Sequence, residues 1–160
     1  MARTPDFDVA AAHRFFAADC FNRAWDLIEK PDRTPADDRL MVALNQASIF
    51  HWLNRPDVTD RNLSVGYWQA ARIFALIGEP ATACRYAQTS LDYSEALGPF
   101  FRGYSYEALA RAALGAGDAE AAGRFLAEAR ALAADVADVE DKALLEKDVE
   151  ALTQQLARRP

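Results

Sequence analysis

Helix-breaking residues divide this sequence into seven segments, each rich in residues that favour helix. Two segments open on Thr followed by Pro, a pair that supplies a side-chain cap and then a residue suited to the first helical turn: Thr4-Pro5 and Thr34-Pro35. Gly78 and Gly117 follow two other segments, as is typical of residues that end helices. The predicted helices span 5–29, 34–54, 63–77, 80–98, 99–116, 118–135 and 138–157.

The balance of residue types argues against strands. The 160 residues include 34 Ala but only 17 Val, Ile and Thr together. Ala is the strongest helix former, whereas β-branched residues favour strands. The sequence therefore predicts an all-α protein. Its longest stretch without charged residues, 40–54, is too short and too polar to span a bilayer, and the beginning of the chain has no apolar leader. We expect a cytoplasmic protein with no membrane partner.

Charge and motif content exclude several function classes. Lys and Arg number 18 against 24 Asp and Glu, a formal net charge of −6, which disfavours nucleic-acid binding. Cys20 and Cys84 lie far apart, so neither a zinc motif nor a disulfide framework is predicted. Neither glycine-rich phosphate-binding motif occurs. No cofactor, metal site or catalytic residue is predicted by this sequence.

The sequence contains an internal repeat. A shift of 39 residues superposes Tyr67 on Tyr106, Ala71 on Ala110, Arg72 on Arg111, Gly78 on Gly117, Ala83 on Ala122 and Arg85 on Arg124. Small residues at the shared positions allow two helices to pack closely, and the shared Gly ends the first helix of each pair. The repeating unit is therefore a helix pair, and a pair cannot bury its apolar face unless it stacks on another pair.

These matches resemble the tetratricopeptide repeat, a helix–turn–helix unit of 34 residues. The residues that fit are Tyr106, Leu109, Ala110, Gly117, Ala122 and Ala129 in one unit, and Tyr67, Ala71, Phe74, Gly78, Ala83 and Ser90 in the preceding unit. The chain departs from the pattern in its longer period and in Ala113, where an aromatic residue is usual. The chain is also similar to bacterial proteins of this helical type, a likeness that implies no particular activity.

The resemblance implies one domain, 1–160, folded as a right-handed α-α superhelix. Three helix pairs (5–54, 63–97 and 100–135) would stack, and a capping helix (138–157) would close the array. The first helix of each pair then lines a concave groove. Such a groove implies a non-catalytic binding module for a protein, a peptide or a small acidic ligand.

Three arginines occupy equivalent groove positions in the repeat alignment: Arg23, Arg72 and Arg111. Guanidinium groups bind carboxylates through paired hydrogen bonds, so an arginine column favours an acidic ligand. The other predicted groove residues are Trp68, Gln69, Tyr104 and Glu107. An alternative interpretation pairs the arginines internally with Asp19, Asp26, Glu107 or Glu79.

A secondary patch is predicted where the second helix ends and the third begins, at His51, Asn54 and Tyr67. The alternative is a cap network, in which Asn54 and Asn62 bond helix ends and the aromatic rings belong to the core.

Two other functions stay open. His13 and His51 favour a metal-dependent or other small-molecule enzyme built on a helical bundle, although the sequence offers no third ligand. Helix faces rich in Ala and Leu favour self-association, so a homodimer is the third alternative.

Overall fold

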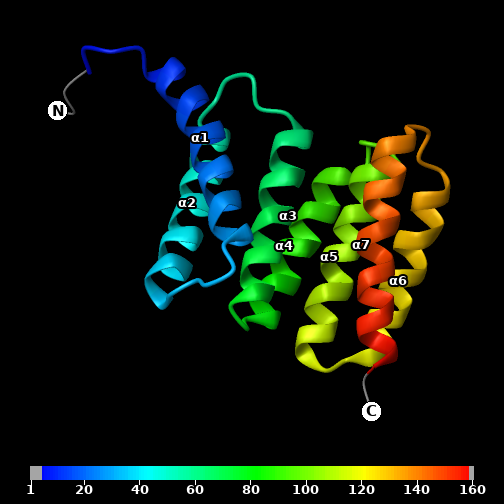
Figure 1. The fold of residues 1–160 in the computed structure, drawn as a ribbon. Helices are drawn as coiled ribbons and strands as arrows, with labels where there is room; N and C mark the ends of the chain where they lie inside the picture. Colours follow the sequence, from blue (N-terminus) through cyan, green and yellow to red (C-terminus); the bar gives the residue numbers. More distant parts are fainter. Residues whose placement is uncertain (1–4, 159–160) are drawn as a thin grey trace.

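The computed structural model describes residues 5–158, which form seven helices (Figure 1). Their bounds are α1 (Val9–Glu29), α2 (Pro35–Leu53), α3 (Asp60–Leu76), α4 (Pro80–Ser94), α5 (Pro99–Ala116), α6 (Ala119–Ala134) and α7 (Val139–Ala157). The described part of the chain contains no strand, so the predicted all-α class is confirmed. No helix in that part is both long and apolar enough to cross a membrane.

Three helix ends differ from the prediction. The first helix begins at Val9 rather than Pro5, because the Asp8 side chain accepts a hydrogen bond from the Ala11 amide and so starts the helix there. Thr4, the predicted cap, lies outside the described residues. The third helix begins three residues early, because Thr59 and Asn62 form a reciprocal capping box, and the fourth ends at Ser94 rather than Gly98.

Gly78, Gly98 and Gly117 lie between helices and have φ values of +80°, +89° and +80°. This left-handed region is strained for residues with a Cβ, and within 5–158 only glycines adopt it. Gly78 and Gly117 follow α3 and α5, so their predicted role as helix stops is confirmed.

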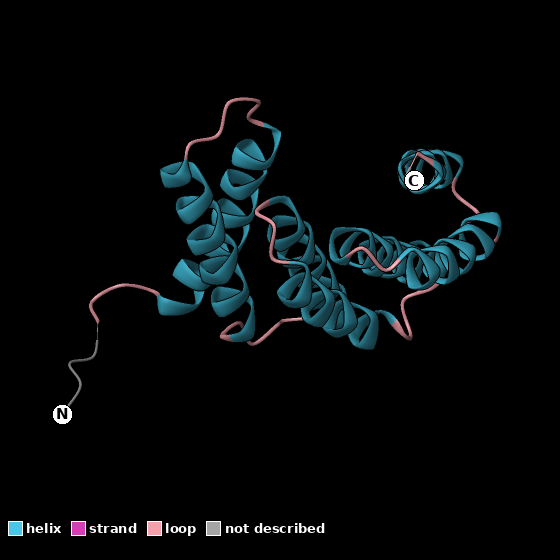
Figure 2. Ribbon diagram, turned by 90° about the horizontal axis from the view of Figure 1, so that it is seen from below, coloured by secondary structure: helices cyan, strands magenta, loops and turns pink. Residues whose placement is uncertain are grey.

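The helices pack as consecutive pairs (Figures 1 and 2). α1 packs on α2, α3 on α4 and α5 on α6, while α2 meets α3 and α4 meets α5 to join one pair to the next. α3 also touches α5, and α7 covers both α5 and α6. Figure 2 shows the pairs side by side, with α7, which carries the C-terminus, on one side of the last pair.

Small residues permit the closest approaches between helices. Ala71 of α3, Ala87 of α4 and Ala108 of α5 are buried in one cluster at the centre of the array. Gly103 of α5 lies directly beneath Leu145 of α7, at a point where any Cβ would collide with the leucine side chain. The absence of a side chain at Gly103 therefore lets Leu145 of α7 pack closely on α5.

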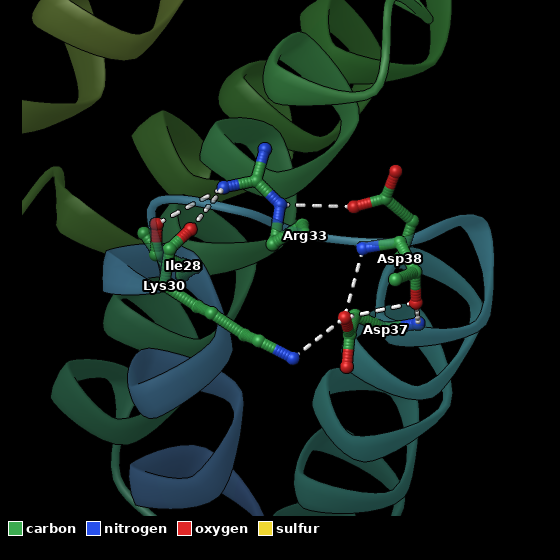
Figure 3. A network of polar contacts seen from close by, with 6 residues as sticks. Ile28, Lys30, Arg33, Asp37 and Asp38 are labelled. Atoms are coloured by element: carbon green, nitrogen blue, oxygen red, sulfur yellow. Dashed lines mark hydrogen bonds and ion pairs between the residues drawn. The ribbon is translucent and has the colours of Figure 1, made fainter.

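A polar network fixes the turn between α1 and α2 (Figure 3). Lys30 Nζ lies 2.8 Å from Asp37 Oδ2, and Arg33 donates from Nε to Asp38 at 2.9 Å and from Nη1 to the Ile28 carbonyl at 3.2 Å. Asp37 also closes a capping box with Thr34. The hydrogen bond from Lys30 contributes most to lowering the pKa of Asp37 to about 2, and the cap bonds with Thr34 lower it further.

Candidate ligand-binding site

Aromatic side chains from three alternate helices form a row across one face of the array. The ring centroids of Trp25 in α1 and Trp68 in α3 lie 5.5 Å apart, and those of Trp68 and Tyr104 in α5 lie 5.3 Å apart. Tyr104 donates a 3.2 Å hydrogen bond to Asp148 of α7. Burial is the main cause that raises the pKa of Tyr104, and the negative charge of Asp148 raises it further. This aromatic row connects the first helices of the pairs to the capping helix.

A cavity of about 220 Å³ opens between α3 and α5 beside the aromatic row. We call it the anchor pocket; its lining residues are Ser64, Val65, Trp68, Ser90, Phe100, Phe101 and Tyr104. Ser90 lies at its base and donates to the Ser64 carbonyl at 2.9 Å, so this buried hydroxyl is already satisfied. The pocket therefore presents mainly apolar and aromatic surface.

A second cavity of about 170 Å³ lies on the other side of Val65, toward α1 and α2. Its lining residues are Phe21, Trp52, Arg61, Asn62 and Val65. Because Val65 lines both cavities, the two hollows flank the same helix, α3.

Two arginines of α3 lie over aromatic rings at this face. The Arg72 guanidinium is 5.5 Å from the Trp25 ring centroid and 6.0 Å from that of Trp68. The Arg61 guanidinium is 5.2 Å from the Phe101 ring centroid. Among residues 5–158, neither arginine forms an ion pair with a carboxylate. Cation–π contact orients each guanidinium while leaving N–H donors for an anion.

The predicted arginine column is only partly present. Arg111 donates from Nε to Glu107 at 3.1 Å, and Glu107 is just 1 % exposed. Trp68 Nε1 adds a long 3.5 Å bond to the same carboxylate. Internal pairing, the alternative weighed above, therefore describes Arg111, and Glu107 is a buried structural partner within the face.

Arg23 does not lie in register with Arg72, so this part of the arginine column is wrong. Trp25 is the α1 residue that meets Arg72 and Trp68. Residues two apart lie on nearly opposite sides of a helix, so Arg23 points away from α3. Its Nη1 instead lies 3.5 Å from Asp19 on the exposed side of α1.

Gln69 lies in the core, fully buried. Its Nε2 donates to the Phe21 carbonyl at 3.0 Å, and its Oε1 accepts from Asn45 at 3.1 Å. One side chain thus bonds α3 to both α1 and α2, a connection between helices rather than a contact for ligand.

The members of the secondary patch face different neighbours. Asn54 donates to the Phe50 carbonyl at 2.8 Å, and Tyr67 stacks on Tyr93 of α4 with ring centroids 5.7 Å apart. Burial, followed by Tyr93, raises the pKa of Tyr67. His51 turns instead toward α1. Asn54 therefore acts as a helix cap and Tyr67 as a packing residue, as in the alternative interpretation.

His13 and His51 are in direct contact, with their Nδ1 atoms 2.8 Å apart. Phe16 and Phe50 surround the pair, each with its ring centroid 5.4 Å from that of His51. Burial is the main cause that lowers the pKa of His51, and the charge of His13 lowers it further. Within residues 5–158 no group of three or more His, Cys, Asp or Glu side chains is placed to hold a metal ion.

Sequence reasoning missed Arg61, Trp25, Phe100 and Phe101 as residues of this face. Arg61 was assigned to a loop, although the Thr59–Asn62 capping box was readable and places it inside the helix. From that start, Arg61, Val65, Trp68 and Arg72 fall at spacings of four, three and four, which is one face of a helix.

Comparison with known proteins gives no match: no family model, no curated protein and no solved structure matches this sequence.

Proposed function

We propose that this protein is a non-catalytic binding module that holds an acidic segment of a protein or peptide partner against the α1–α3–α5 face. The observation that carries the proposal is the anchor pocket together with Arg61 and Arg72, which lie over two of its lining rings, Phe101 and Trp68, and have no carboxylate partner among residues 5–158. Among residues 5–158 these are the two arginines that lie over an aromatic ring and form no ion pair. Their chemistry suits carboxylates.

The proposal includes a tetratricopeptide-like superhelix for the array. Consecutive helix pairs, the glycine stops after α3 and α5, and the buried Ala71, Ala87 and Ala108 between pairs all support it. In a superhelix of this kind the first helices of the pairs line the concave side. The aromatic row on α1, α3 and α5 would then lie in that groove.

Selection from a displayed library of random peptides tests the proposed function. Peptides enriched on the full chain are then measured against Val65→Trp, which fills the hollows beside α3, and Arg72→Gln, which removes a cation. Arg85→Gln is the matched control, because Arg85 is exposed on α4 and its side chain donates to Thr82. We expect binding to be lost in the first two variants and kept in the control. Failure to enrich any peptide, or equal binding by all variants, contradicts the proposal.

A further inference from the structure

The chemistry of the α3 face narrows the ligand of the proposed site. Arg61, Val65, Trp68 and Arg72 form one stripe along α3. The two arginines are 11 positions apart (72 − 61), which is about 16 Å along a helix. Each guanidinium lies over a ring that also lines the anchor pocket, Phe101 for Arg61 and Trp68 for Arg72. The order along the face is therefore cation, apolar hollow, cation.

The anchor pocket is large enough for one bulky apolar side chain. Its volume is about 220 Å³. An apolar cavity of about 150 Å³ in another protein holds benzene, so this volume is sufficient for a Phe or Leu side chain. Val65, Phe100 and Phe101 supply apolar walls, and the serine hydroxyls at the base are already bonded to protein atoms.

The arginines are available to a ligand because the neighbouring carboxylates have other partners. Glu107 is bonded by Arg111 and Trp68, and Asp148 accepts from Tyr104. No acid of residues 5–158 forms an ion pair with either guanidinium, and an aromatic ring orients each one. Their N–H groups can therefore donate hydrogen bonds to the carboxylates of a ligand.

We propose that the α3 face recognises an extended peptide of the pattern acid–x–apolar–x–acid, an inference that rests on the proposed function. In an extended chain alternate side chains share one side, and residues four apart are separated by about 13 Å. This separation is about 3 Å shorter than the roughly 16 Å between Arg61 and Arg72 along α3, and the flexible arginine side chains can make up that difference. The central apolar side chain enters the anchor pocket, and the two side-chain carboxylates bind Arg61 and Arg72.

Fluorescence anisotropy with the full chain tests this pattern. The probe is a labelled peptide, Gly-Glu-Ser-Phe-Ser-Glu-Gly, with a blocked C-terminus so that only side-chain carboxylates are present. Replacing both Glu by Gln, or Phe by Ser, is expected to weaken binding at least 10-fold, since each removes a charged or buried contact. Arg61→Gln and Arg72→Gln should each weaken binding of the Glu peptide about 10-fold, with the Arg85→Gln control unchanged.

The outcomes separate this inference from the proposed function. Two results would overturn the acid–x–apolar–x–acid pattern but not the binding function. The first is equal binding of the Glu and Gln peptides. The second is no binding of the probe while library-selected peptides still require Val65 and Arg72. Loss of dependence on Val65 and Arg72 for every peptide overturns both.

A second copy of the chain is the occupant that the test must exclude. Phe7 is exposed and flanked by Asp6 and Asp8, so this segment is itself acidic and aromatic. Sedimentation of the unliganded protein at rising concentration is expected to show no association that depends on Phe7. If the protein associates, and if Phe7→Ser and Arg72→Gln each abolish that association, the face binds a second copy of the chain. That result would overturn the peptide proposal.

Discussion

At the C-terminal end of the array α7 buries one apolar stripe, whereas at the N-terminal end α3 is the main helix among residues 5–158 that packs on the first pair. Leu145, Val149 and Leu152 of α7 join a core cluster with α5 and α6. The first pair leaves large apolar side chains exposed: Phe15, Phe16, Leu40, Phe50 and Leu53. Its contacts include the polar turn around Asp37 and the His13–His51 pair.

The contrast indicates which contacts hold each end. Stability in a stacked array is approximately a sum of local terms, so the two ends respond separately to substitution. We expect apolar burial to dominate at the α5–α6–α7 end, and polar bonds to contribute more at the α1–α2 end.

The largest effect is expected at the capping helix. Leu145→Ala removes a fully buried side chain and should lower the free energy of unfolding by about 3 kcal/mol. Leu144→Ala, at a neighbouring residue that is 53 % exposed, should change it by less than about 0.5 kcal/mol. Urea unfolding followed by circular dichroism measures both. Similar losses in the two variants would show that α7 does not dock through its buried stripe.

Gln69→Ala should cost about 2 kcal/mol, because the substitution removes two hydrogen bonds of a buried side chain, one with Asn45 and one with the Phe21 carbonyl. The loss should appear as faster hydrogen exchange in α1 and α2, with α6 and α7 unchanged. Gln155→Ala, at an exposed position of α7, is the matched control. Uniform acceleration along the whole chain would contradict the separate behaviour of the two ends.

Acidification should loosen the N-terminal pair before the C-terminal helices. Because the fold lowers the pKa of His51, the unfolded chain binds more protons than the folded chain as pH falls below the usual value of about 6.5. The free energy of unfolding therefore decreases from pH 7 through that value, until folded His51 also becomes protonated. Hydrogen exchange at pH 7 and pH 5 reports this for α1–α2, and His51→Gln should reduce the dependence. An identical pH response in His51→Gln would exclude His51 as its source.

The smallest effect is expected at the α1–α2 turn. Asp37→Asn should lower the melting temperature modestly near pH 6, because it removes the charge that Lys30 contacts. The pKa of Asp37 in the fold is about 2, below its ordinary value near 3.9, so this contribution is present above the ordinary value and is lost as pH falls through 2. The difference in melting temperature between wild type and variant should therefore narrow toward pH 2. A constant difference would mean that the charge is not what stabilises the turn.

Local signals made most of the helices predictable. Thr34-Pro35, Gly78 and Gly117 act through their own backbone and adjacent residues, and each has the predicted role. The start of α1 was misplaced because Asp8 caps the helix within an otherwise plausible helical segment. Such local competition between two caps is hard to resolve from residue type alone.

The candidate site was only partly predictable, since it depends on register between helices. The structure brings Trp68, Arg72 and Tyr104 together, because α3 and α5 follow the 39-residue repeat. The first pair does not follow it, so Trp25 rather than Arg23 meets Arg72. Gln69 was predicted as a groove residue, yet its partners on α1 and α2 bury it. Such partners lie far away in sequence and leave no local signal.

Titration of isotopically labelled protein with the Glu-Ser-Phe-Ser-Glu peptide, followed by two-dimensional nuclear magnetic resonance, tests the central claim most directly. The account predicts that the indole N–H signals of Trp25 and Trp68 and the amide of Val65 shift in proportion to peptide added, while signals from α6 stay in place. Shifts confined to the exposed phenylalanines of α1 and α2, with the two indole signals unmoved, would contradict it.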